Sequence, residues 1–138
     1  MKRITLHEVR FIAFQLAQEL MAWNEPIPEF TTRFPQKLES CLETPFQTFQ
    51  RKPLYKGLTG KATALFYFLV KNHPFQNGNK RIAVTTLLVF LHKNKKWITV
   101  SPDALYRFAV SVAESDAKDK DKTMEFIKLF IEKYLENL

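Results

Sequence analysis

The sequence predicts an all-α fold: a bundle of about six helices around one hydrophobic central helix, with a short extended segment beside it. Apolar side chains recur at helical spacing along almost the whole chain, which is the main signal for helices. Only 3 of the 138 residues are glycine, and this argues against a loop-rich or barrel fold. The length predicts a single domain over residues 1–138, and a hydrophobic fraction of 46% can build a core without staples.

The amino-terminal part predicts two helices and one extended segment. The first helix should run from Thr5 to about Ala22, because Thr5 and Glu8 form a capping-box pattern before an apolar stripe. The stripe consists of Leu6, Val9, Ile12, Ala13, Leu16 and Leu20. Prolines within 24–35 end this helix, and a short helix over 36–43 follows. The segment 44–57, where aromatic and basic residues are interleaved, is predicted to be extended or a hairpin.

The carboxy-terminal part predicts four further helices. One spans about 59–72 and must end before Pro74, because proline cannot continue a helix. The next begins near Asn79 and is apolar almost all round, which marks it as the central helix. After a possible strand at 97–100, Ser101 or Asp103 caps another helix. The last, amphipathic helix follows 118–122, and its apolar residues are Phe126, Leu129, Phe130, Tyr134 and Leu135.

The charge is unevenly distributed along the chain. The net charge is +7, yet residues 44–102 contain no Asp or Glu and ten cations. These are Arg51, Lys52, Lys56, Lys61, Lys71, Lys80, Arg81, Lys93, Lys95 and Lys96. Surfaces usually mix signs, so the basic middle predicts an anionic partner: a nucleotide, an acidic protein or, less favoured, a nucleic acid.

Cysteine content and hydropathy predict the compartment. The one cysteine, Cys41, permits no internal disulfide and is interpreted as a small buried apolar residue. No apolar run approaches the length of about 20 residues that spans a membrane, and no amino-terminal segment has the pattern of a signal peptide. We therefore expect a soluble cytoplasmic protein that does not act at a membrane.

The stretch 73–81, His-Pro-Phe-Gln-Asn-Gly-Asn-Lys-Arg, lies between two apolar helices and has the features of an anion site. Gly78 permits a tight turn, and Asn79 is a good N-cap for the helix whose free amides point into the loop. Lys80 and Arg81 fall in the first turn, where the helix dipole disfavours cations by about 0.3–1 kcal/mol each. A bound phosphate would explain them, and His73 at the other lip of the loop can accept a proton.

This stretch resembles the Fic/Doc motif H-P-F-x-[D/E]-G-N-[G/K]-R and departs from it only at Asn77, where the family has Asp or Glu. Residues 38–42, the segment through Tyr55, the helix ending at Asn72 and the tail 87–97 also look like Doc-type members. The resemblance covers most of the chain. It implies a protein-modifying enzyme of the phospho- or nucleotidyl-transferase type, with a Fic-type helical fold.

The resemblance also implies roles for individual residues. His73 would be the catalytic base that takes the proton of a target hydroxyl, and Phe75 would anchor the loop. The phosphate- and nucleotide-binding residues would be Gly78, Asn79, Lys80 and Arg81. The segment 44–57 would be the flap that binds the target, through Phe49, Lys52 and Tyr55. ATP or another nucleoside triphosphate would be the substrate, and Asn77 would hold Mg²⁺ weakly because its oxygen is neutral.

Three functions stay open at the level of sequence. Lys80 is typical of Doc-type toxins, which phosphorylate a translation elongation factor, whereas adenylyltransferases of the family usually have Gly there. A Fic-type adenylyltransferase is the first alternative. A degenerate fold that binds a partner or nucleic acid through its basic middle is the second, favoured by Asn77. The inhibitory pattern [S/T]-x-x-x-E-[G/N] is not found, so a separate antitoxin protein is expected to restrain the enzyme.

Overall fold

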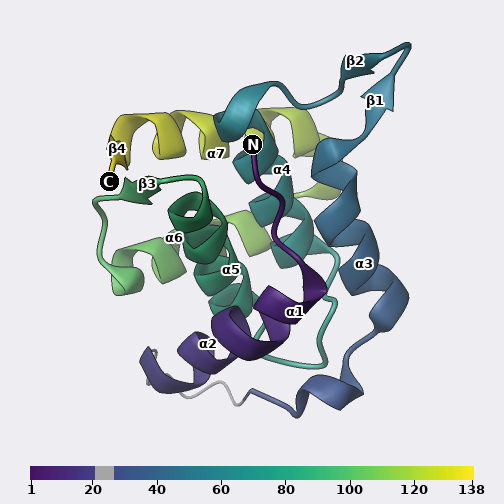
Figure 1. Cartoon of the computed structure of the whole chain (residues 1–138), viewed down its shortest axis with the longest axis vertical. Helices are drawn as coiled ribbons and strands as arrows, with labels where there is room; N and C mark the ends of the chain where they lie inside the picture. The colour runs from purple at the N-terminus through teal and green to yellow at the C-terminus, as the bar shows by residue number, and fades with distance from the viewer. Residues whose placement is uncertain (21–26) are drawn as a thin grey trace.

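The structure, a computed structural model, describes residues 1–20 and 27–138 and is built mainly of helices (Figure 1). The helices are α1 (Leu6–Glu8), α2 (Phe14–Leu20), α3 (Pro35–Glu43), α4 (Gly57–Lys71), α5 (Asn79–Lys93), α6 (Pro102–Ala113) and α7 (Lys120–Tyr134). Short helical turns are η1 (Val9–Ala13), η2 (Phe30–Thr32), η3 (Thr44–Phe46) and η4 (Ala117–Asp119). The strands are β1 (Thr48–Phe49), β2 (Lys52–Pro53), β3 (Lys96–Ile98) and β4 (Leu135–Asn137). The all-α prediction is therefore confirmed.

The first predicted helix is present as the continuous run α1, η1 and α2, and the Thr5–Glu8 capping box forms as predicted. Its middle is a π-helical turn, in which i→i+5 bonds widen the helix and shift the phase of the side chains. Val9 and Ala13 are therefore buried, whereas Ile12 is 44% exposed. The prediction that Ile12 belongs to the buried stripe is wrong. The predicted end at Ala22 lies outside the described residues.

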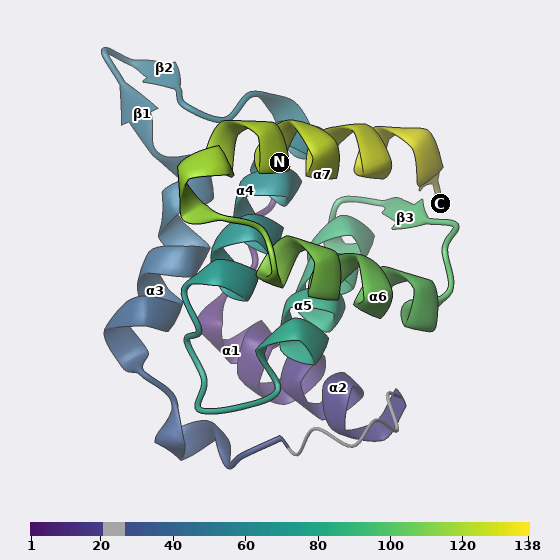
Figure 2. The same cartoon turned by 180° about the vertical axis from the view of Figure 1, so that it is seen from behind.

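Helices α4 and α5 form the centre of the molecule and run antiparallel, joined by the loop 72–78 (Figures 1 and 2). In α5 the run from Arg81 to Leu87 is buried without interruption, so α5 is the predicted central helix. Such a helix must be covered on every side, and α2, α4, α6 and β3 all pack against it. Cys41 of α3 is fully buried, and this burial raises the pKa of its thiol to about 11.

The segment 44–57 contains a hairpin, as predicted. β1 and β2 pair antiparallel with Phe49 opposite Lys52, and the two turn residues Gln50 and Arg51 both have positive φ angles, 50° and 66°. This is the backbone of a tight primed turn, normally built with Asn or Gly. The predicted strand near 97–100 is present as β3, which pairs with β4 at the carboxy terminus, a partner that the sequence pattern did not indicate.

The last two helices agree with prediction in position but not wholly in orientation. Ser101 caps α6, since its hydroxyl accepts from the Ala104 N–H at 3.1 Å. In α7 the buried residues are Thr123, Ile127 and Ile131. Phe126 and Leu129, which were predicted to form part of the buried face, are 54% and 55% exposed, because α6 and α4 contact the neighbouring stripe. In the part of the chain that is described, no helix is long and apolar enough to cross a membrane.

Candidate functional site

The predicted site is the loop 72–78 between α4 and α5, and its backbone is strained at His73. Asn72 caps α4 by donating its N–H to the Phe68 carbonyl. His73 is exposed and has a φ of 49°, in the left-handed region that non-glycine residues rarely adopt. Gly78 has a φ of 74° and is the N-cap of α5. A non-glycine residue in this conformation persists only where its surroundings enforce it, and such positions cluster at functional sites.

Phe75 holds the loop in the core. Its side chain is 1% exposed and its ring lies 5.7 Å from that of Phe14 and 5.9 Å from that of Phe30, centroid to centroid. Phe14 and Phe30 also contact one another, at 5.5 Å. Three aromatic rings from α2, η2 and the loop thus form one buried cluster. His73 remains at the surface because Phe75, two residues later, is fixed inside.

Asn79 has a different role from the predicted one. It is the first residue of α5 rather than its N-cap, and its side chain is 7% exposed. Its Oδ1 accepts from the Phe75 N–H at 2.9 Å, and its Nδ2 donates to the Phe75 carbonyl at 2.9 Å. One amide therefore satisfies both backbone groups of a buried residue and closes the loop into a fixed turn. This bond pair is not visible in a pattern of residue types.

Arg81 is also placed differently from the prediction. Its side chain is only 5% exposed, and its Nη2 donates to the Ala17 carbonyl of α2 at 2.5 Å. The cation thus lies at the carboxy-terminal, negative end of α2, where a positive charge is favourable. The conflict with the dipole of α5 is resolved within the protein, so Arg81 has a structural role that the sequence did not reveal. Lys80 is half-buried at the start of the same helix.

The donor set of the loop does not fit the Mg²⁺ site that the resemblance implies. Asn77 is half-buried, and its Oδ1 accepts from the N–H of Gly78 at 3.0 Å. Within residues 1–20 and 27–138, no group of three or more His, Cys, Asp or Glu side chains could hold a metal ion. Glu8, considered as a distant substitute, instead pairs with Lys93 at 2.7 Å, at the far end of α5. The loop therefore offers neutral oxygens where Mg²⁺ prefers anionic ones.

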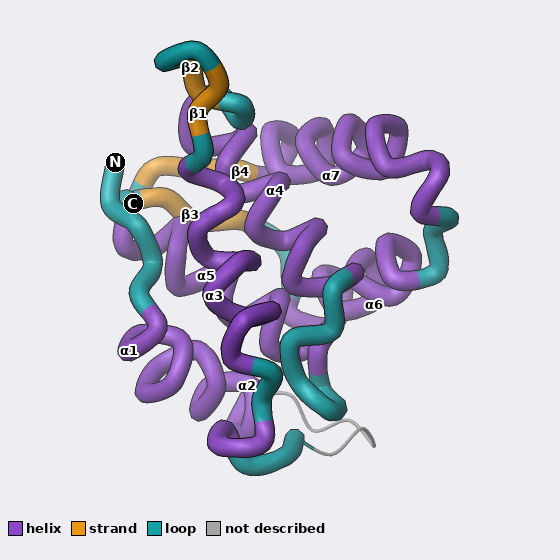
Figure 3. The backbone as a smooth tube through the Cα atoms, turned by 90° about the vertical axis from the view of Figure 1, so that its right-hand side faces the viewer, coloured by secondary structure: helices purple, strands orange, loops and turns teal. Residues whose placement is uncertain are grey.

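The predicted flap does not lie at this loop. The hairpin precedes α4 and His73 follows it, so Phe49, Lys52 and Tyr55 lie at the opposite end of α4 from His73 (Figure 3). Since α4 has 15 residues at a rise of about 1.5 Å, the separation along its axis is roughly 20 Å. The loop is bordered instead by the chain after η2, where the Phe34 N–H donates to the Pro74 carbonyl at 2.9 Å.

The basic middle is divided by the same geometry. Helices α4 and α5 are mostly buried, so their cations gather at the two ends of the pair. The end with the hairpin carries Arg51, Lys52, Lys56, Lys61, Lys93, Lys95 and Lys96, whereas the end with the loop carries Lys71, Lys80 and Arg81. The ten cations do not form one groove, contrary to what the sequence alone suggested.

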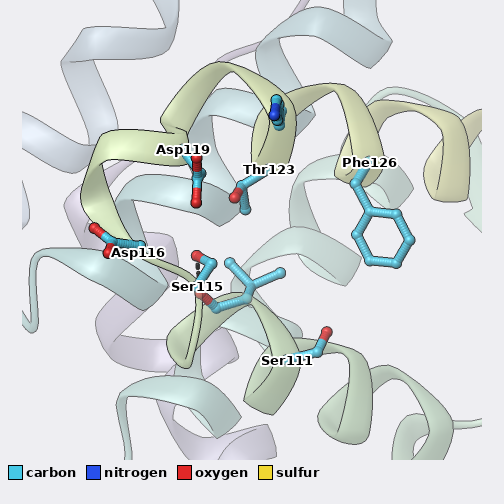
Figure 4. Close-up of a pocket in the computed structure, with 8 residues that line it drawn as sticks. Ser111, Ser115, Asp116, Asp119, Thr123 and Phe126 are labelled. Carbon is cyan, nitrogen blue, oxygen red and sulfur yellow. Dashed lines mark hydrogen bonds between the residues drawn. The ribbon is translucent and has the colours of Figure 1, made fainter.

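One cleft adjoins His73. It has a volume of about 400 Å³ and is lined by Gln36, Lys37 and Ser40 of α3 together with Asn72. The sequence did not indicate these α3 residues as site residues, because nothing in their spacing marks them. A second hollow, of about 320 Å³ between α6 and α7, is lined by Ser111, Ser115, Asp119 and Thr123 among others (Figure 4). No residue of 73–81 lines that hollow.

Comparison with known protein families gives the class. The model of the Fic/DOC family matches residues 3–91, which is more than half of the chain and includes the loop 72–78. The chain belongs to the Fic/DOC family. Members of this family are generally transferases that modify proteins and use nucleoside triphosphates as substrates. Comparisons with curated proteins and with solved structures found no match.

Proposed function

We propose that this protein is a Doc-like toxin that transfers the γ-phosphoryl group of ATP, or of another nucleoside triphosphate, to a Ser or Thr hydroxyl of a target protein. The observation that carries the proposal is the exposed His73, held in a left-handed conformation beside the amino terminus of α5. A translation elongation factor is the target that the Doc-type resemblance suggests. Lys80, the residue typical of Doc-type members, favours phosphorylation over adenylylation.

The reaction assigned to these residues is an in-line displacement. The target hydroxyl oxygen forms a bond to the γ-phosphorus, and the bond from that phosphorus to the bridging oxygen of the leaving diphosphate breaks. His73 accepts the hydroxyl proton as general base, and the nucleoside diphosphate leaves. Most of the catalysis in phosphoryl transfer is positioning and charge stabilisation. Lys80 and the amides of the first turn of α5 supply the positive potential.

The acceptor segment of the target is proposed to lie across α3 rather than the hairpin. The cleft lined by Gln36, Lys37 and Ser40 adjoins Asn72, so a chain lying there would reach His73 directly. Phe34 is 44% exposed and its backbone is bonded to Pro74, which fixes an apolar contact point beside the loop. Phe49, Lys52 and Tyr55 would contact only a target large enough to extend along α4.

A separate antitoxin is proposed to restrain the enzyme, and the protein is proposed to act in the cytoplasm. An acidic or amphipathic antitoxin segment would meet either the loop end or the hairpin end, since the cations are divided between them. Binding that depends on exposed charges should weaken as salt shortens the screening length to about 8–10 Å.

The experiment is intact-mass analysis of proteins from a cell extract incubated with ATP and either the wild-type chain or the His73→Ala variant. A target that gains one phosphate with wild type, and none with His73→Ala, supports the proposal. Loss of a general base typically lowers the rate about 10²–10⁴-fold. Circular dichroism must show that the variant is folded, and unchanged transfer by a folded variant would remove His73 from the mechanism.

Two alternatives have distinct outcomes in the same experiment. A gain of one AMP would identify a Fic-type adenylyltransferase, in which the target hydroxyl attacks the α-phosphorus and diphosphate leaves. No modification, together with growth arrest on expression, would identify a non-catalytic fold that acts by binding. The neutral Asn77, whose oxygen is already bonded to Gly78, is the observation that favours this last outcome.

A further inference from the structure

A cleft of about 310 Å³ lies between α7 and the segment that joins the hairpin to α4. Leu54, Tyr55 and Lys56 form one wall with the first turns of α4, and Asp121, Met124 and Glu125 of α7 form the other. This cleft lies at the end of α4 opposite to His73, and no residue of the loop 72–78 lines it. Volumes of about 300 Å³ and above are typical of small-molecule sites.

The most buried residue of the lining has an unsatisfied polar group. Thr63 of α4 is 3% exposed, and its hydroxyl has no hydrogen-bond partner among the residues that the structure describes. A buried threonine in a helix commonly donates to a carbonyl of its own preceding turn, as Thr85 does to Arg81 at 3.2 Å. Leaving a buried hydroxyl without a partner destabilises the fold by about 1–3 kcal/mol. A ligand group in the cleft would remove this cost.

The rim of the cleft carries both signs of charge. Asp121 and Glu125 lie one helical turn apart on α7, and neither forms an ion pair with any residue in 1–20 or 27–138. Lys56 stands on the facing wall, whereas the remaining lysine of the lining, Lys128, lies 3.9 Å from Glu132. Asp121 faces the aromatic wall closely enough to act, after burial, as the second cause of the raised pKa of Tyr55.

We propose that this cleft binds a free amino acid with an apolar side chain. The ammonium group would lie between Asp121 and Glu125, and the carboxylate would face Lys56. The apolar side chain would contact Leu54 and Met124, and the buried Thr63 hydroxyl would gain a hydrogen-bond partner. An ammonium alone would leave Lys56 unmatched, and a carboxylate alone would face two acids. The site is separate from the proposed transfer reaction and does not depend on it.

Occupation of the cleft would also affect the hairpin. The wall is fixed to α4 because Lys61 donates to the Tyr55 carbonyl at 2.6 Å, and because Gly60 allows the Tyr55 backbone to approach closely. A Cβ at Gly60 would lie only 3.2 Å from the Tyr55 carbonyl carbon. A ligand that bridges this wall to α7 would hold the base of β2, and with it the hairpin, against the body of the protein.

The test is a titration of the isotope-labelled full chain with L-leucine, followed by backbone amide NMR. Three probes remove one feature each: isoamylamine lacks the carboxylate, 4-methylpentanoate lacks the ammonium, and glycine lacks the apolar side chain. We expect L-leucine to shift the amides of 54–63 and 121–128, with binding at about 1 mM or tighter. Each of the other probes should bind at least about tenfold more weakly, since each loses one charged or apolar contact.

Two variants form a matched pair. Thr63→Val removes the unsatisfied hydroxyl of the cleft, and Thr86→Val removes the other fully buried threonine hydroxyl that lacks a partner in the described chain, on α5 away from the cleft. Both should leave the unliganded fold at least as stable as wild type. Only Thr63→Val should weaken L-leucine binding, by about three- to tenfold.

The carboxylates have their own control. The double change Asp121→Asn with Glu125→Gln should weaken L-leucine binding by about tenfold or more, whereas Glu39→Gln on the exposed face of α3 should not change it. The proposal is overturned if L-leucine shifts no amide of the cleft, if isoamylamine or 4-methylpentanoate binds equally well, or if Thr86→Val weakens binding as much as Thr63→Val.

Discussion

The clamp between Asn79 and Phe75 makes the sharpest prediction about the site. Replacing Asn79 by Ala removes two hydrogen bonds of 2.9 Å and leaves the N–H and the carbonyl of a buried residue without partners. Each buried backbone group left without a partner costs about 1–3 kcal/mol, so the free energy of unfolding should fall by about 2–5 kcal/mol. That is a large part of the 5–15 kcal/mol that is typical of a whole domain.

The assay is urea unfolding at equilibrium, followed by far-ultraviolet circular dichroism and fitted by linear extrapolation. Asn77→Ala is the matched control: Asn77 is half-buried, and it donates or accepts only one printed bond, to its neighbour Gly78, so its loss should cost less than about 1 kcal/mol. Asn79→Asp, which keeps the acceptor but loses the donor, should lie between Asn79→Ala and wild type. If Asn79→Ala costs no more than Asn77→Ala, the clamp does not hold the loop.

Three further predictions concern charged and metal-binding groups. Arg81→Ala should lower the free energy of unfolding by about 1.5–3 kcal/mol in urea melts, because it removes a buried charged hydrogen bond to Ala17; a neutral effect would restore Arg81 to a purely ligand-binding role. Asn77→Asp should raise the transfer rate and sharpen its dependence on Mg²⁺ concentration while leaving the melting temperature nearly unchanged, and equal rates for both forms would exclude a metal role at this position. Burial acts to raise the pKa of Glu8, but hydrogen bonds from Lys93 and Thr5 outweigh it and hold the pKa below 4.5. This stabilisation is therefore present above pH 4.5 and is lost as the pH falls through the folded-state pKa, so Glu8→Gln should flatten the acid limb of a stability–pH curve.

The sequence determined much of this protein because much of its information is local. Helical periodicity located α3, α4, α5, α6 and α7 to within a few residues, and proline and glycine marked the loop between α4 and α5. The near-continuous apolar run of α5 identified the central helix before any partner helix was known. The motif at 73–81 indicated the family, which the family comparison confirmed.

Which side of a helix is buried was decided only by tertiary structure. A π-helical turn in the first helix moved Ile12 to the surface, and no pattern of residue types specifies such a turn. In α7, the neighbours α4 and α6 covered the stripe of Ile127 and Ile131, leaving Phe126 and Leu129 exposed although they are equally apolar. Periodicity predicts that a stripe is buried, but the choice between two adjacent stripes depends on the shape of what packs against them.

The roles of polar residues depended on tertiary structure even more strongly. Asn79 and Arg81 read as surface residues facing a ligand, yet both are buried, because Phe75 and Ala17 present backbone groups that need partners. The hairpin and His73 are close in sequence but lie roughly 20 Å apart along α4, since a helix converts 15 residues into a rigid spacer. Residue types specify which hydrogen bonds are possible, and only the folded backbone decides which of them form.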